Sequence, residues 1–152
     1  MGEHLTIDEV QYVAHSLAQV FLKWDEPIPD FSTRYPNYLE SCINQPFQIV
    51  SNKRLYPTMK KKGAILFYLM IKNHPFKNGN KRIAITTLLY FLSKSKKWLK
   101  IDNQVLYNFA KFVAESPSDY KDNMLEIIEE FIQKYLTELP PTPVINEQPE
   151  AR

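Results

Sequence analysis

The stretch that decides the fold reads GAILFYLMI (residues 63–71), KN (72–73), HPFKNGNKR (74–82) and IAITTLLYFL (83–92). Two almost uninterrupted apolar runs flank a polar loop that contains a glycine. A helix that is apolar on every side is buried rather than amphipathic, so we predict two central buried helices joined by this loop. A polar loop held between two buried helices is where we look for a functional site.

The composition limits the class of protein. The chain has 152 residues, of which 44% are hydrophobic and 13% aromatic, enough for one domain with a core. Only three glycines are present, which favours helices over an all-β protein with many tight turns. The net charge of +2 does not indicate a nucleic-acid partner. The apolar runs are too short to span a bilayer, and a single cysteine without a visible signal peptide predicts a cytoplasmic protein.

Helix signals flank the central pair. Thr6 to Glu9 fits a capping box that opens a first helix. The inward face of this helix is predicted to carry the large apolar residues Val10, Val13, Leu17, Val20, Phe21 and Trp24, and His15 is predicted to lie off that face, at the surface. Further helices are predicted from Asn37 to Asn44, from Thr58 to about Asn73, from Gly79 or Asn80 to about Lys97, after Asp102, and from Ser118 or Asp119.

A small β-hairpin is predicted just before the central helices. Phe47-Gln48-Ile49-Val50 and Arg54-Leu55-Tyr56 flank Ser51-Asn52-Lys53, which is a pattern of two short strands around a turn. At the end of the chain, residues 139–152 are rich in proline and polar residues. We therefore predict one domain of residues 1–138 followed by a disordered tail.

The residue types of the loop suit the transfer of a phosphate-containing group. His74 can accept a proton from a hydroxyl near neutral pH. Gly79 lets the backbone approach a ligand, and the amides at the start of the next helix favour an anion. Asn80 adds side-chain donors, while Lys81 and Arg82 supply fixed positive charge. As composition alone, the loop is better explained by a buried, hydrogen-bonded His74 with solvated Lys81 and Arg82.

The nonapeptide His74 to Arg82 resembles the signature of the Fic/Doc family, His-x-Phe-x-acid-Gly/Ala-Asn-Gly/Lys-Arg. Residues 55–58 (LYPT) and 71–73 (IKN) are also similar to its Doc-like, death-on-curing branch. The resemblance implies an all-α fold, a compact helical bundle in which the hairpin is a flap that aligns the target segment by strand addition. It implies the following roles: His74 as catalytic base, Phe76 as structural anchor of the loop, Gly79, Asn80, Lys81 and Arg82 as nucleotide-binding groups, and Phe47, Gln48, Ile49, Val50 and Tyr56 as the flap.

Two positions indicate the subtype. Most family members have glycine where this chain has Lys81, and they transfer AMP, whereas the Doc branch has lysine there. The resemblance to Doc implies that ATP binds reversed and presents its γ-phosphate, as in a kinase. AMP-transferring members also carry a second arginine where this chain has Ile85. We therefore expect phosphorylation of a serine or threonine hydroxyl, and place it ahead of the alternative, an adenylyltransferase.

One position departs from the family pattern. The acid that holds Mg²⁺ against the phosphates is replaced by Asn78, whose amide oxygen is neutral, and Mg²⁺ prefers a carboxylate. Asn78 is still the predicted metal position. Because Asn78 replaces the acid, a pseudoenzyme that binds a nucleotide without catalysing transfer is an alternative to an active enzyme. A nuclease or nucleic-acid binder is a third class, and the nearly balanced charge argues against it.

The resemblance also implies cofactors and partners. We expect ATP and Mg²⁺, and a protein target for which the family precedent is a translation elongation factor. The chain shows no Ser/Thr-x-x-x-Glu-Gly/Asn segment of the kind that inhibits some family members in cis. The expectation is therefore a toxin restrained by an antitoxin acting in trans, with no membrane or nucleic-acid partner.

Overall fold

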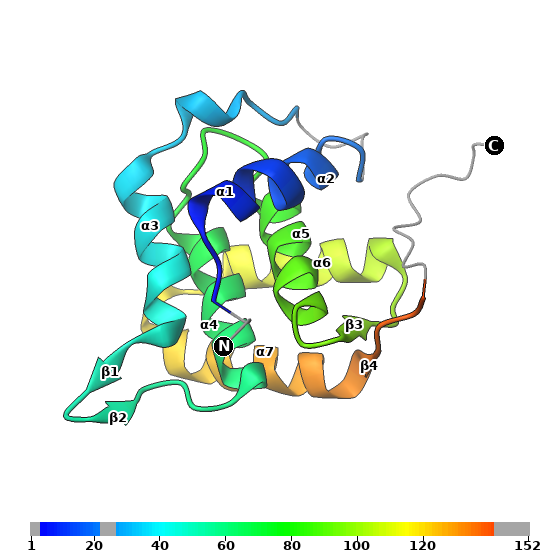
Figure 1. The fold of residues 1–152 in the computed structure, drawn as a ribbon. Coiled ribbons are helices and arrows are strands. Elements are labelled where there is room, and N and C mark those ends of the chain that lie inside the picture. Colours follow the sequence, from blue (N-terminus) through cyan, green and yellow to red (C-terminus); the bar gives the residue numbers. More distant parts are fainter. Residues whose placement is uncertain (1–3, 22–26, 142–152) are drawn as a thin grey trace.

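Helices α4 (Met59–Lys72) and α5 (Asn80–Ser93) form the centre of the fold (Figure 1). The computed structural model describes residues 4–21 and 27–141, so Trp24 and residues 142–152 of the predicted tail lie outside the described residues. Every residue of α4 from Lys62 to Ile71 is buried, which confirms the prediction of an all-round buried helix. The described part of the chain contains no helix that is long and apolar enough to cross a membrane. The fold is mostly helical, as predicted.

The first helix crosses α5 and consists of α1 (Ile7–Glu9), the π-helical segment η1 (Val10–His15) and α2 (Ser16–Ala18). The predicted capping box is present, because Thr6 N donates to Glu9 Oε1 at 3.0 Å and Glu9 N donates to Thr6 Oγ1 at 3.1 Å.

The predicted inward face of the first helix is correct for Val10 and Phe21 and wrong for Val20, while Val13 and Leu17 are only half-buried. Its buried residues are Val10, Ala14, His15, Ala18 and Phe21, whereas Val20 is 49% exposed. Thr86 Oγ1 of α5 donates to the carbonyl oxygen of Ala14 at 2.7 Å, and only small side chains permit such a close approach of two helices. The alanines therefore face the core, and His15 is buried beside them.

The segment between the first helix and α4 contains the predicted hairpin. Helices η2 (Phe31–Thr33), α3 (Pro36–Asn44) and η3 (Gln45–Phe47) come first. Strands β1 (Ile49–Val50) and β2 (Lys53–Arg54) then pair antiparallel. Ser51 and Asn52 have positive φ angles of 51° and 65°, which is the geometry of a type I′ turn.

Helices α6 (Asn103–Glu115) and α7 (Lys121–Tyr135), the latter preceded by η4 (Ser118–Tyr120), pack on the central pair. Asp102 caps α6, since its side chain accepts from Gln104 N at 3.0 Å. Gly63 allows α7 and α5 to pack closely on α4, because a Cβ there would lie 3.3 Å from side-chain atoms of both Ile132 and Leu88.

A second small sheet was not predicted. Helix α5 ends at Ser93 rather than near Lys97, and Lys96 turns the chain with a φ of 62°. Strand β3 (Lys97–Leu99) then pairs antiparallel with β4 (Leu136–Glu138). Leu139 N donates to Lys96 O at 3.0 Å, so the folded chain continues past residue 138, where the tail was predicted to begin.

Candidate active site in the loop between α4 and α5

Residues 73–79 connect α4 to α5 and carry most of the predicted site. Two of them have positive φ angles: His74 at 49° and Gly79 at 73°. A positive φ is uncommon for residues other than glycine and persists where the surroundings enforce it, which is frequent at functional sites. The loop therefore has a defined, non-helical shape at both ends.

The side chains of Phe76 and Asn80 hold this shape. Phe76 is 1% exposed, and its ring lies near those of Phe31 (centroids 5.9 Å apart) and His15 (5.8 Å). Asn80 Oδ1 accepts from Phe76 N at 3.0 Å, and Asn80 Nδ2 donates to Phe76 O at 2.8 Å. The Asn80 amide thus serves the loop itself, a role that the sequence analysis did not identify.

His74 is exposed at the start of the loop. Its nearest side-chain partner is Asn80, whose Nδ2 lies 3.5 Å from His74 Nδ1. That distance is at the outer limit of a hydrogen bond, so it constrains the ring weakly. When Nδ1 accepts this contact, the neutral ring carries its proton on Nε2. General-base action by Nε2 requires the other tautomer.

Lysines lie on both sides of Gly79. Lys77 is exposed and Lys81, in the first turn of α5, is half-buried. Gly79 provides no side-chain cap for α5. No aspartate or glutamate occurs in the sequence between Glu40 and Asp102. A helix N-terminus with lysines beside it suits a phosphate group.

Arg82 has partners other than a ligand in this structure. Its side chain is 2% exposed, Nε donates to Phe21 O at 2.7 Å, and Nη2 donates to Ala18 O. These carbonyls lie at the C-terminal end of the first helix, where backbone acceptors lack helical partners. Arg82 therefore ties α5 to the first helix, and its predicted phosphate contact stays a prediction.

Residues 27–35, which we call the crossing segment, cover the loop. A Cβ on Gly79 would lie 2.5 Å from Ile28 Cδ1, the terminal atom of that side chain, so Ile28 would have to move, and the positive φ is the main reason for a glycine here. Tyr35 N donates to Pro75 O at 2.8 Å. With the contact of Phe31 on Phe76, three residues of the crossing segment touch the loop.

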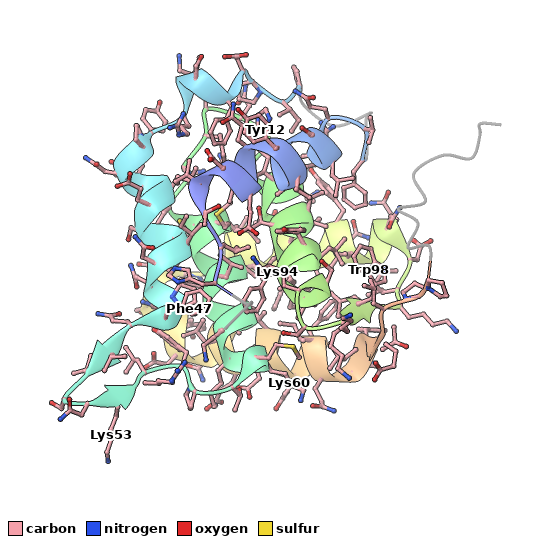
Figure 2. The ribbon with its side chains drawn as sticks, in the orientation of Figure 1. Tyr12, Phe47, Lys53, Lys60, Lys94 and Trp98 are labelled. Atoms are coloured by element: carbon pink, nitrogen blue, oxygen red, sulfur yellow. The ribbon has the colours of Figure 1, made fainter. Side chains whose placement is uncertain are left out.

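The predicted flap lies elsewhere. The hairpin precedes α4 and the loop follows it, and the 14 residues of α4 separate the two by about 21 Å along the helix (Figure 1). Phe47 stacks on His4 with ring centroids 4.3 Å apart. The exposed hairpin carries Lys53 away from the helices (Figure 2). The structure therefore does not bring Phe47, Gln48, Ile49, Val50 and Tyr56 to His74, and the crossing segment occupies that place.

The donor set of the loop fits phosphate better than it fits Mg²⁺. Asn78 is exposed and offers a neutral amide oxygen, and residues 73–79 contain no carboxylate. The described residues contain no cluster of three or more His, Cys, Asp or Glu side chains suited to a metal. Mg²⁺ generally combines one or two carboxylates with phosphate oxygens, so the loop alone does not form such a site.

Comparison with known proteins found one family match, and its range includes the loop. The family model described as "Fic/DOC family" matches residues 4–92, which extend from the first helix through the loop to the end of α5. Searches of the curated proteins and of the solved structures found no significant match. The match includes the first helix, the crossing segment, α4, the loop and α5, which are the elements that build the site.

Proposed function

Since this chain belongs to the Fic/DOC family, we propose that it phosphorylates a serine or threonine hydroxyl of a target protein with ATP. The family in general transfers nucleotide-derived groups to proteins. The observation that carries the proposal is the HPFKNGNKR loop, fixed between two buried helices with His74 exposed and Lys81 in the first turn of α5.

The proposed reaction uses groups that the loop presents. A ring nitrogen of His74 takes the proton of the target hydroxyl as its oxygen attacks the γ-phosphorus of ATP. The bond between that phosphorus and the oxygen bridging to the β-phosphate breaks, and ADP leaves. Lys81 and the N-terminus of α5 offset the negative charge of the phosphates. Mg²⁺, carried mainly by the nucleotide, would add positive charge beside Asn78.

Lys81 supports phosphoryl transfer over transfer of AMP. It lies on the first turn of α5 and is half-buried, so its side chain takes up part of the space at the helix N-terminus. Ile85 lies one turn further, is fully buried and supplies no second cation. AMP transfer to a protein hydroxyl remains the alternative, and it differs in which phosphate is attacked.

Asn78 supports a second candidate function, a nucleotide-binding pseudoenzyme. The anion site does not depend on residue 78, whereas metal binding does. A protein with this loop would bind ATP and transfer slowly or not at all.

The crossing segment is the part of the chain best placed to meet the target. It lies on the loop, and its Tyr35 side chain is 44% exposed. We assign target alignment to this segment rather than to the hairpin. The toxin role, a trans-acting antitoxin, an elongation-factor target and a cytoplasmic location rest on the family resemblance and belong to the proposal.

The proposal is tested by two labelling reactions in a bacterial lysate, one with ATP labelled at the γ-phosphate and one with ATP labelled at the α-phosphate. We expect label on protein from the γ position alone, and none with His74→Ala. Label from the α position would establish AMP transfer instead. No label from either, with ATP binding retained in calorimetry, would establish the pseudoenzyme.

A further inference from the structure

We propose that His15 is a positioning residue of this site: it holds the crossing segment against the loop and thereby sets the affinity for the protein target. This inference rests on the proposed function. His15 bonds to Pro29 of the crossing segment, and its ring also lies 5.8 Å, centroid to centroid, from the ring of Phe76 in the loop.

The first step of the argument is the position of His15. It is 4% exposed on the face of the first helix that packs inward, where its neighbours in the sequence are alanine and serine. His15 Nε2 lies 2.9 Å from Pro29 O. A buried polar group needs such a partner, and this one joins the first helix to the third residue of the crossing segment.

Contacts within the crossing segment hold its residues in a fixed arrangement, so a bond at Pro29 also positions the other residues of the segment. Asp30 Oδ2 accepts from Ser32 N at 3.2 Å and so caps η2. The guanidinium carbon of Arg34 lies 4.4 Å from the centre of the Phe31 ring. The edge of the His15 ring meets the same Phe31 ring, with centroids 5.2 Å apart. The segment is therefore a folded unit that contacts His15 of the first helix at Pro29 and Phe31.

The other side of this unit lies on the loop. Ile28, Phe31 and Tyr35 contact Gly79, Phe76 and Pro75 respectively. A target hydroxyl must reach His74, and Pro75 is the next residue. The hydrogen bond between His15 and Pro29 therefore reaches the target position through the crossing segment and its bond from Tyr35 N to Pro75 O.

A histidine that only fills the core would behave differently from a positioning residue. Loss of a core side chain lowers the free energy of unfolding and leaves the folded enzyme's kinetics unchanged. Loss of a positioning residue raises KM for the target while the chemical step and ATP binding stay the same. The two roles are separated by the choice of measurement.

The experiment compares His15→Met, which keeps bulk but removes the N–H donor, with His15→Gln, which retains an N–H donor. Tyr12→Met is the control, because Tyr12 lies in the same π-helical segment and is 69% exposed (Figure 2). For transfer from γ-labelled ATP to the target, we expect His15→Met to raise KM by up to about tenfold, the equivalent of one hydrogen bond. His15→Gln should recover most of that loss, and Tyr12→Met should match the wild type.

A second readout does not depend on transfer. The Tyr35 amide donates to Pro75 O, so its hydrogen exchange reports whether the crossing segment lies on the loop. We expect this amide to exchange several-fold faster in His15→Met than in the wild type, at a temperature where circular dichroism shows both folded. Unchanged exchange, or a fall in kcat without a rise in KM, would overturn the inference. Failure of the wild type to label any protein would count against the proposed function. The exchange result would then decide whether His15 holds the crossing segment on the loop.

Discussion

The side-chain amide of Asn80 is hydrogen-bonded in both directions to the backbone of Phe76, with Oδ1 3.0 Å from Phe76 N and Nδ2 2.8 Å from Phe76 O. These two bonds join Asn80, the first residue of α5, to Phe76, four residues earlier in the loop. Asn80 is 8% exposed, so water does not replace these bonds readily when they are lost. The Asn80 amide is therefore one of the groups that fix the shape of the loop.

Asn80→Asp should lower the free energy of unfolding by about 1–3 kcal/mol. The substitution keeps the acceptor for Phe76 N but brings a carboxylate oxygen against the carbonyl of Phe76. Urea unfolding measures the effect. Asn108→Asp is the matched control, since Asn108 is exposed and its Oδ1 only accepts from Gln104 Nε2 at 3.0 Å. Equal stability of the two variants would contradict the role assigned to Asn80.

Gly79→Ala should destabilise the protein by about 1–2 kcal/mol, because an L-residue is strained at a φ of 73° and the new Cβ meets Ile28 Cδ1. Ile28→Val shortens the opposing side chain and should recover part of the loss in the double variant. Gly63→Ala is a comparison for crowding alone, because its Cβ would lie 3.3 Å from side-chain atoms of Ile132 and Leu88 without a strained φ. If the changes in the free energy of unfolding for Gly79→Ala and Ile28→Val simply add in the double variant, the contact between the two positions does not contribute to the destabilisation.

Arg82→Lys should lower the free energy of unfolding by about 1.5–3 kcal/mol, because an ammonium does not reproduce the planar fork that reaches both Phe21 O and Ala18 O. ATP affinity should change little in the folded variant. Lys81→Met, in contrast, should weaken ATP binding in calorimetry. A large loss of ATP affinity in folded Arg82→Lys would instead support the predicted phosphate contact of Arg82.

Asn78→Asp should increase transfer activity and make ATP binding more dependent on Mg²⁺. The new carboxylate would add a negatively charged oxygen ligand to a loop that contains none. The measurement is the rate of transfer from labelled ATP across a Mg²⁺ titration, with Asn108→Asp as control. A rate that stays at zero while ATP binding tightens would show that the defect lies outside the metal site.

His15 should give stability a pH dependence near neutrality. Burial lowers the pKa of His15 below its ordinary value of 6.5, although the hydrogen bond with Pro29 and the charge of Asp30 oppose the shift. The unfolded chain therefore takes up a proton at a higher pH than the folded protein does. The free energy of unfolding should fall as pH drops below about 6.5, and this part of the dependence should be absent from His15→Gln.

The pKa of Glu9 is also shifted, but its carboxyl titrates at lower pH than His15, so it does not affect the comparison of stability near neutral pH. Burial opposes its ionisation, but hydrogen bonds from Lys94, the Thr6 backbone and Tyr90 outweigh this and lower the pKa of Glu9 below 4.5. Its contribution to stability is present above that pH and is lost as the pH falls further. A difference between wild type and His15→Gln confined to pH below 4.5 would show that His15 is not the source.

Much of the helical architecture was predictable because its signals are local. The all-round apolar runs gave α4 and α5, and the capping side chains of Thr6, Thr58 and Asp102 mark the helix starts that were predicted from them. The Ser51–Asn52 turn likewise follows from neighbouring residues. Helix caps and tight turns depend on residues only a few positions apart in the chain, so they can be predicted directly from the sequence.

Features that join distant segments were missed. Strands β3 and β4 pair residues about forty positions apart, and nothing in Lys97–Leu99 alone specifies that partner. The face of the first helix was partly misassigned because large apolar residues were expected inward. Close approach to α5 selects alanine at 14 and 18 instead, so Arg82 and Thr86 reach the backbone.

The sequence by itself determined which residues form the loop, its two buried helices and the family to which the chain belongs, because the nonapeptide and the apolar runs are contiguous. The tertiary structure alone decided what surrounds that loop. It buried His15 and Arg82, brought residues 27–35 onto Gly79 and Phe76, and placed the hairpin at the far end of α4. These outcomes depend on which helix faces pack together, and that choice is made by the shapes of all the side chains at once.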